Sequence, residues 1–126
     1  MAKWANDSMM DAALAYVADN GDRLDVCSGQ PANYAGIAAV TLATVALTAG
    51  AGNGDYTLAN GDTNGRKLTV AAQSGLSVTA SDTATHIAIS DGSATLLYVT
   101  TCTSQALTSG NTVNVPAFDI EIADPS

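Results

Sequence analysis

Apolar side chains recur at helical spacing in the first stretch of the chain. Asp7 or Ser8 can cap such a helix, and Ser8 with Asp11 forms a pair that resembles a capping box. The stretch ends at Asn20-Gly21, a typical helix stop. One face is formed by residues at this spacing: Met10, Ala13 or Leu14, and Val17. We therefore expect residues 1–21 to form an N-terminal helical segment that lies against a sheet or another subunit.

From residue 22 onward the apolar positions alternate instead. The segment RLDVC places Leu24 and Val26 on one face, and SGQPANYAG between residues 28 and 36 is typical of a loop. Further strands are expected in VTLATVALT, RKLTVAA, LSVT, ATHIAIS, TLLYVTT and TVNVPAFDIEI. Short strands at this spacing, with turn residues between them, predict an antiparallel β-sandwich of jelly-roll or Ig-like type over residues 22–126.

The clearest hairpin signal is Asp91-Gly92, between two alternating segments. The pattern predicts an antiparallel pair of strands, with these side chains in the core: Ile87, Ile89, Leu97 and Val99. Pro116 interrupts the last alternating segment and predicts an edge strand or a bulge.

Length and composition support a mostly β fold. The chain has 126 residues, which is the size of a single domain. Its 47% apolar fraction consists mainly of Ala, Val, Ile and Leu, and Thr is abundant, whereas most strong helix formers are scarce. Twelve acidic against four basic residues give a net charge of -8, which disfavours nucleic acid as a partner.

No apolar run approaches the ~20 residues of a membrane span. Asp7 and Asp11 interrupt the N-terminal apolar stretch, so we expect no signal peptide and synthesis in a cytosol. A disulfide between Cys27 and Cys102 is one interpretation of the two cysteines. The other, favoured in a reducing compartment, is two small buried side chains.

The stretch LANGDTNGRKLTV, residues 58–70, comes closest to a binding motif. Asn60, Asp62, Asn64 and Gly65 match the start of an EF-hand loop, but its twelfth position is Ala71 and strands flank it. A phosphate loop would need a Gly-Lys-Ser/Thr sequence followed by a helix. We therefore interpret this stretch as a turn, with Gly61 and Gly65 at positive φ, and expect no metal or other cofactor.

Arg66 and Lys67 are half of the basic residues in the chain. They either bridge to nearby aspartates in solvent or contact another protein, where Arg favours forked carboxylate recognition. Trp4, Met9 and Met10 also have two interpretations. They either fix the helix to the body of the protein or pack on a neighbouring subunit. Interface candidates are accordingly Trp4, Met9, Met10, Arg66 and Lys67.

Catalytic signals are weak. His86 is the single histidine, and a Ser-His or Cys-His site would need a nucleophile to meet it in space. Asp119 and Glu121 share one strand face opposite Phe118 and Ile120, as solvated residues do. One His and two Cys are too few for a typical zinc site. We therefore expect a protein that is not an enzyme.

Taken together, several segments resemble small tailed-bacteriophage proteins that accompany the capsid genes: WANDSMMDAALAYVADN, DVCSGQP, NGDTNGRKLTVAA, ATHIAISDG and LLYVTTCTSQALTSGNTVNVPAFDIEIADP. Proteins of that kind are described as head decoration (cement) proteins or other virion proteins. The segment ALTSGNTVNVPAF is also similar to β-sandwich modules of phage fibres and necks.

The resemblance implies a structural protein of the virion, made in the cytoplasm of a bacterial host. It would decorate or cement the capsid through contacts with the major capsid protein or another virion protein. As an alternative, it implies a tail, neck or head-fibre module that binds a host surface or glycan. We expect a symmetric homo-oligomer, a trimer or a dimer, because closed symmetry buries repeated apolar patches, and we expect no nucleic acid or membrane partner.

Overall fold

The computed structural model describes residues 4–52 and 54–124, and its contacts divide the chain into two compact units. Unit 1 contains Met1–Asn20, Thr48–Ala72 and Pro116–Ser126, and unit 2 contains Gly21–Leu47 and Gln73–Val115. Residues 1–3 of the expected helical segment lie outside the described part. The prediction of a mostly β protein with antiparallel sheets and an N-terminal helix is confirmed. That residues 1–126 fold as a single domain stays a prediction.

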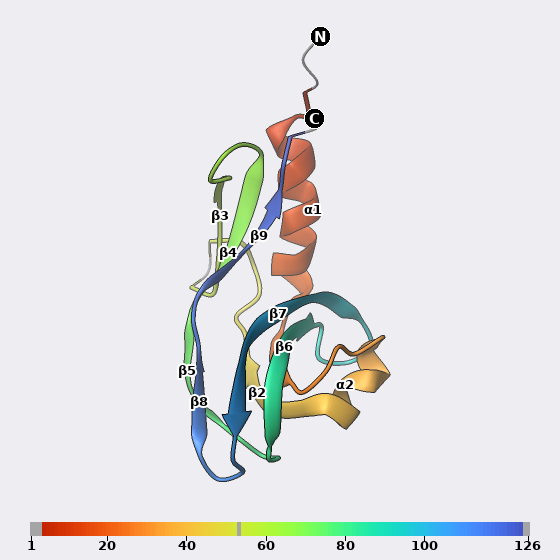
Figure 1. Cartoon of the computed structure of the whole chain (residues 1–126). Helices are drawn as coiled ribbons and strands as arrows, with labels where there is room; N and C mark the ends of the chain where they lie inside the picture. The colour runs from red at the N-terminus through yellow and green to blue at the C-terminus, as the bar shows by residue number, and fades with distance from the viewer. Residues whose placement is uncertain (1–3, 53, 125–126) are drawn as a thin grey trace. The chain divides into compact units, whose positions relative to one another are not determined.

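Unit 1 is a helix packed on a three-stranded sheet. The helix is α1 (Asp7–Asn20), and the antiparallel strands β3 (Tyr56–Asn60), β4 (Arg66–Val70) and β9 (Phe118–Ile122) lie in the order β3-β4-β9. Figure 1 shows α1 running alongside these strands. Alternation along β4 buries Leu68 and Val70, whereas Lys67 and Thr69 are less buried and lie on the other face. The core of this unit contains Met10, Leu14, Ala18, Tyr56, Leu68, Val70 and Ile120.

The N-terminal cap of α1 lies one residue before the first of the two expected capping residues. Asn6, not Asp7 or Ser8, accepts the first hydrogen bonds: its Oδ1 atom accepts from Ser8 N at 2.8 Å, and its carbonyl accepts from the N–H groups of Met9 and Met10. The predicted end at Asn20 is confirmed. The buried residues are four apart, Met10, Leu14 and Ala18, whereas Val17 is half-buried and Ala13 is exposed.

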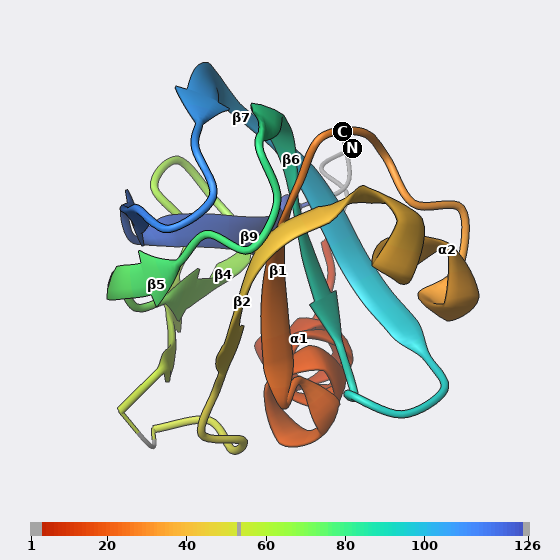
Figure 2. The same cartoon turned by 90° about the horizontal axis from the view of Figure 1, so that it is seen from below.

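Unit 2 contains two sheets and a short helix. A four-stranded antiparallel sheet has the order β2-β1-β6-β7, and β5 pairs with β8. Figure 2 shows the four strands side by side, with α2 beside them. An isolated bridge between Ala43 and Val78 links the two sheets. The elements are β1 (Arg23–Cys27), α2 (Tyr34–Val40), β2 (Thr41–Ala46), β5 (Gln73–Ser77), β6 (Asp82–Ser90), β7 (Leu96–Leu107) and β8 (Thr112–Val115).

Helix α2 begins inside the segment that we expected to be a loop. Asn33 is extended, at φ -161°, and its side chain accepts a hydrogen bond from Gly36 N at 2.8 Å. Ile37 is buried, and this burial compensates for the low helix propensity of a segment that contains Tyr34 and Gly36. The loop prediction for residues 34–36 was therefore wrong, because a cap and one buried anchor stabilise a helix of only seven residues.

The hairpin at Asp91-Gly92 is confirmed as a turn between two antiparallel strands. Asp91 Oδ1 accepts from the N–H groups of Ser93, Ala94 and Thr95 at 2.8 to 2.9 Å. These backbone donors, the Thr95 N–H first, lower the pKa of the Asp91 carboxyl well below its usual range. Gly92 has a φ of 77°.

The core assignment of the second hairpin strand needs a correction. Ile87 and Ile89 are buried as predicted, but Leu97 and Val99 are only half-buried. Residues Tyr98 and Thr100 are opposite Ile89 and Ile87, because the register shifts between Ile89 and Ser90. A register shift of this kind moves side chains to the opposite face of the sheet.

Pro116 lies between two strands rather than inside one. The alternating segment TVNVPAFDIEI is divided into β8, which pairs with β5 in unit 2, and β9, which pairs with β4 in unit 1. Proline cannot donate a ladder hydrogen bond, and it favours an extended residue before it. The chain therefore leaves one sheet at Val115 and enters the other at Phe118.

Candidate functional site

The loop between β3 and β4 has the structure of a turn. Gly61 N donates to Gly65 O at 2.9 Å, and Gly65 has a φ of 71°. Gly61 does not have the positive φ that we expected. A side chain there would instead collide with the carbonyl of Asn64. In the part of the chain that the structure describes, no three His, Cys, Asp or Glu residues form a group that could hold a metal ion.

Arg66 and Lys67 both pair with aspartates of unit 1. Arg66 Nε lies 2.7 Å from Asp11 Oδ1 on α1, with a second, longer bond at 3.3 Å, and Arg66 also donates to Asn60. Lys67 Nζ lies 2.7 Å from Asp62 Oδ1 and 3.5 Å from Asp119 Oδ2. Of the two interpretations of Arg66 and Lys67, these pairs match the one in which both side chains bridge to nearby aspartates.

The same contacts account for the electrostatics of the two cations. The hydrogen bond from Arg66 to Asp11 raises the pKa of Arg66, and the hydrogen bond from Lys67 to Asp62 raises the pKa of Lys67. Arg66 therefore ties α1 to β4, because its forked guanidinium binds both carboxylate oxygens of Asp11. Asp119 also accepts from Thr69 Oγ1 at 2.7 Å, and Asp119 and Glu121 are exposed on the face opposite Ile120.

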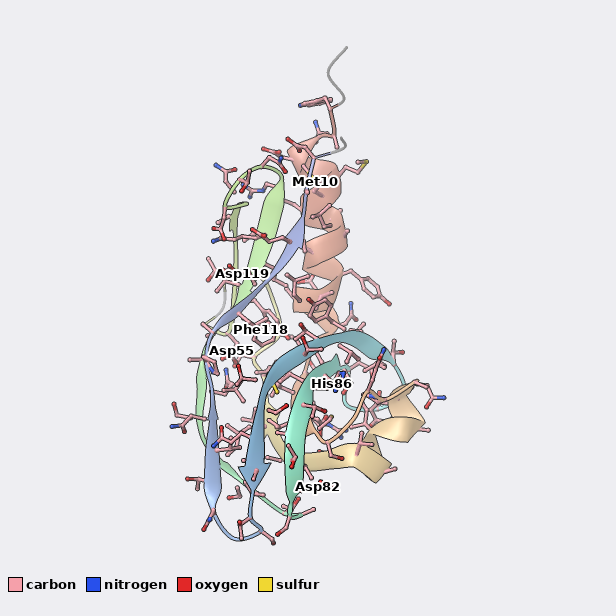
Figure 3. The ribbon with its side chains drawn as sticks, in the orientation of Figure 1. Met10, Asp55, Asp82, His86, Phe118 and Asp119 are labelled. Carbon is pink, nitrogen blue, oxygen red and sulfur yellow. The ribbon has the colours of Figure 1, made fainter. Side chains whose placement is uncertain are left out.

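Helix α1 places its candidate interface residues on different sides. Met10 is only 2% exposed and belongs to the core of unit 1, whereas Trp4 is 76% and Met9 62% exposed. Figure 3 labels Met10 near the start of α1. Tyr16, which the sequence analysis did not select, is 60% exposed. Its position seven residues after Met9 puts the two on one side of the helix, a signal that helical spacing contains.

We call this side the outer face of α1, formed by Met9, Ala12, Ala13 and Tyr16. At about 100° per residue these four positions lie opposite Met10, Leu14 and Ala18. All four are exposed, and none carries a charge. The helix therefore presents one apolar side to its sheet and a second apolar side to solvent.

Unit 2 also contains a buried polar cluster that the alternation of apolar residues does not predict. Asp25 is 1% exposed, and its Oδ1 atom accepts from Thr41 Oγ1 at 2.9 Å and from Thr44 Oγ1 at 2.6 Å. Arg23 Nε donates to Oδ2 at 2.9 Å, and the guanidinium lies 5.4 Å from the centre of the Tyr34 ring. Burial alone would lower the pKa of Arg23, but the hydrogen bond and charge of Asp25 outweigh it and raise this pKa.

A pocket of about 410 Å³ lies over this cluster. Its lining combines the guanidinium of Arg23, the carboxylate of Asp25 and the methyl group of Ala38 with hydroxyl groups from Thr41, Thr44, Ser77 and Thr79. Asp25 already accepts three hydrogen bonds, so the cluster is internally satisfied. Its first effect is to hold β1 to β2, because both threonines belong to β2.

Cys27 and His86 are cross-strand partners on β1 and β6. Burial raises the pKa of the Cys27 thiol to about 12, which keeps it protonated and unreactive at neutral pH. His86 Nδ1 lies 2.8 Å from Thr85 Oγ1, and Thr101, not Cys102, is opposite His86. Both cysteines are free, so the disulfide interpretation is wrong, and Cys27 is buried while Cys102 is half-buried.

None of the helices in the described ranges has the length and apolar character needed to cross a membrane. In comparisons with known proteins, the chain matches no protein family, no curated protein and no solved structure.

Proposed function

We propose that this chain is a non-enzymatic structural protein of a tailed-bacteriophage particle, which decorates or cements the capsid surface through protein–protein contacts. The observation that supports it most directly is the outer face of α1. Met9, one of the expected interface residues, is exposed there together with Tyr16, and Trp4, three residues before the helix begins, is exposed as well. Attachment would bring this face against the major capsid protein or another virion protein.

A helix that is apolar on both sides is expected to be covered on both sides. The inner side of α1 is covered by β3 and β4 of its own unit. On the outer side, the large side chains of Met9 and Tyr16 flank two alanines, so a partner can approach the helix closely. Burying such side chains on association contributes roughly 25 cal/mol per Å² of apolar surface. The free energy gained by burying this apolar surface favours a protein partner for the outer face.

The alternative is a tail, neck or head-fibre module that binds a host surface or glycan. The pocket in unit 2 is the observation that favours it. Thr41, Thr44, Ser77 and Thr79 supply hydroxyl groups, and Arg23 supplies a guanidinium beside them. Such a set matches the donors and acceptors of a sugar. A glycan array probed with the purified protein tests this alternative independently of particle binding.

Quantitative mass spectrometry of purified virions tests the role in the particle. A decoration protein is expected at a copy number comparable to that of the major capsid protein, since it follows the capsid lattice. A few copies per virion would support the neck, tail or fibre alternative. Absence from purified virions would refute both.

A binding experiment then tests the surface. Purified wild-type protein and a Tyr16→Glu variant are added to capsids that lack the chain, and bound protein is measured by co-sedimentation. Thr103→Glu, at an exposed position of β7 in unit 2, is the matched control. We expect wild type and Thr103→Glu to bind alike and Tyr16→Glu to lose most binding. Equal binding of all three proteins would remove the outer face from the proposal.

A further inference from the structure

We propose that the outer edge of β7, along residues 96–101, binds an extended segment of another protein as an added β-strand. The segment that fits this edge is apolar at alternate positions, uncharged in its middle and basic at its flanks. This inference goes beyond the proposed function, because β7 belongs to unit 2 whereas the outer face of α1 belongs to unit 1. In strand addition, backbone hydrogen bonds provide affinity and alternate side chains provide specificity.

The backbone of β7 is unpaired on one side. Strand β7 lies at the end of the four-stranded sheet, and among the described strands it pairs only with β6 (Figure 2). In the described part of the chain, no recorded backbone hydrogen bond joins residues 96–101 to any other segment. The N–H and C=O groups of every second residue in an edge strand point away from its partner strand. They form a row of donors and acceptors at strand spacing, which another extended chain complements.

The opposite edge of the same sheet is covered. Ala43 of β2 forms a bridge with Val78, and Thr79 N donates to Leu42 O at 2.8 Å. The segment that joins β5 to β6 therefore pairs with the backbone of β2. Among the described residues, β7 has no such neighbour on its outer side. The two edges of the sheet thus differ, and only one of them is available to a partner strand.

The side chains at this edge are half-buried and largely apolar. Residues 96–100 are all half-buried, whereas Ile87, Ala88 and Ile89 of the neighbouring β6 are buried. Successive residues of a strand point to opposite faces, so partial exposure on both faces is what a missing neighbour strand produces. Residues 96–107 contain no charged residue and no proline, which are features that protect natural edge strands from pairing. Covering these side chains favours association.

The pairing with β6 limits the length of the edge. It is regular from Tyr98 to Thr101, and the register shifts on either side of this stretch. Residues 102–104 lie opposite Thr85 alone, because Ala84 pairs with Gln105 and His86 with Thr101. Such a bulge interrupts the ladder. Thr103 therefore lies outside the proposed edge, and an added strand matches residues 96–101.

Charge defines the flanks of the partner segment. The single lysine or arginine of unit 2 is Arg23, and it is paired with Asp25. Against this one cation, unit 2 contains Asp22, Asp25, Asp82 and Asp91. Basic flanks are attracted to such a unit, and acidic flanks are repelled. The middle of the segment must be uncharged, because a charge beside Leu97 and Val99 would lose its water.

Amide hydrogen exchange followed by NMR tests whether the edge is open. In the free protein, alternate amides of residues 98–101 should exchange fast, because they face solvent, and the others slowly, because they bond to β6. Protection of every amide of residues 98–101 in the free protein would overturn the proposal.

A synthetic peptide then serves as the probe, with about eight residues of alternating valine and threonine and a lysine at each end. It is N-methylated along one edge, so that it cannot stack on itself and pairs through its other edge. Titration into the protein is expected to protect the fast amides of residues 98–101. A peptide N-methylated along both edges should not bind, and one with glutamate at each end should bind more weakly. Equal binding of the doubly methylated peptide, or no binding of the probe at millimolar concentration, would overturn strand addition.

A pair of protein variants tests the position. Val99→Lys should weaken binding of the probe by at least about ten-fold, because it places a charge in the middle of the added interface. Thr103→Lys adds the same charge outside the regular ladder, and it should bind within about two-fold of wild type. Equal binding of the two variants would overturn residues 96–101 as the site. Far-UV circular dichroism checks folding, and if Val99→Lys does not fold, the methylated peptides decide the question.

A second copy of the chain is the competing occupant. Protection of the same amides that increases with protein concentration, without peptide, would indicate self-pairing and overturn the partner segment. These outcomes are separate from those of the proposed function. Capsid binding that depends on Tyr16 stands or fails whether or not β7 binds an added strand.

Discussion

Asp25→Ala is the substitution expected to disturb unit 2 most directly. The carboxylate is buried and accepts three hydrogen bonds, from Arg23, Thr41 and Thr44. Its removal leaves two threonine hydroxyls and a guanidinium without their acceptor. It also removes the two shortest side-chain hydrogen bonds that join β1 to β2 at this point, and leaves the longer one from Thr44 Oγ1 to Leu24 O at 3.4 Å.

The magnitude follows from the burial of the two ion-pair partners. Removing one partner of a buried ion pair typically costs about 3–5 kcal/mol. Arg23 is 30% exposed, so water can solvate part of its freed guanidinium, and we lower the expected cost to about 2–4 kcal/mol. At roughly 4 °C per kcal/mol for a chain of this size, the melting temperature should fall by about 8–16 °C. Asp25→Asn keeps an acceptor for the threonines but turns a donor toward Arg23, so an intermediate cost of about 1–2 kcal/mol is expected.

Urea denaturation followed by circular dichroism, together with differential scanning calorimetry, measures both variants. Asp22→Ala is the matched control, since Asp22 is exposed and its side chain makes no hydrogen bond recorded among the described residues. It should change the free energy of unfolding by less than about 0.5 kcal/mol. The reasoning is refuted if Asp25→Ala is as stable as Asp22→Ala, because the cluster would then contribute nothing to holding β1 and β2 together.

Three further predictions follow from other parts of the structure. The free energy of unfolding should fall between pH ~9 and ~12 by up to about 1.4 kcal/mol per pH unit. The reason is that the Cys27 thiol of the unfolded chain ionises near its ordinary pKa, whereas burial keeps the thiol of the folded chain protonated up to a pKa of about 12. A Cys27→Val variant that shows the same decline in urea titrations would contradict this. Gly65→Ala should lower the free energy of unfolding by clearly more than the roughly 1 kcal/mol expected for Gly75→Ala. Both glycines have a φ of 71°, but of the two only Gly65 lies against a backbone oxygen, that of Ile122. Equal losses for the two variants in urea denaturation would mean that the backbone moves away from the added methyl group without a penalty. Neither calcium nor EDTA should shift the melting temperature by more than about 1 °C, and a larger shift in a thermal scan would make Asp62 a candidate ligand.

The sequence predicted those elements whose signals are local. Helix α1 has apolar residues at a helical period and an Asn-Gly stop, and the Asp91-Gly92 turn has a side chain that binds the following backbone N–H groups. Both signals depend only on neighbouring residues. The pairing of Arg66 and Lys67 with aspartates was anticipated as one of two interpretations, but Asp11 as the partner of Arg66 depends on how α1 packs on β4.

The elements that sequence reasoning missed depend on tertiary contacts. Alternation in RLDVC put Leu24 and Val26 inward and therefore left Asp25 outward, yet Asp25 is buried because β2 supplies hydroxyl donors to it. Helix α2 required a buried anchor, Ile37, that a period count cannot identify in seven residues. The faces of Leu97 and Val99 depend on a register shift that leaves no local signal.

The division of the chain between the two units affects the order in which they can form during synthesis. Unit 2 has all of its strands once the ribosome has passed Val115. Unit 1 must wait for β9, because this strand pairs with β4 and supplies Ile120 to the core. Until then, β4 has an unpaired edge and α1 has an incomplete platform. An unpaired strand edge of this kind is open to mispairing, and β9, which covers it, is complete only seven residues of chain after β8.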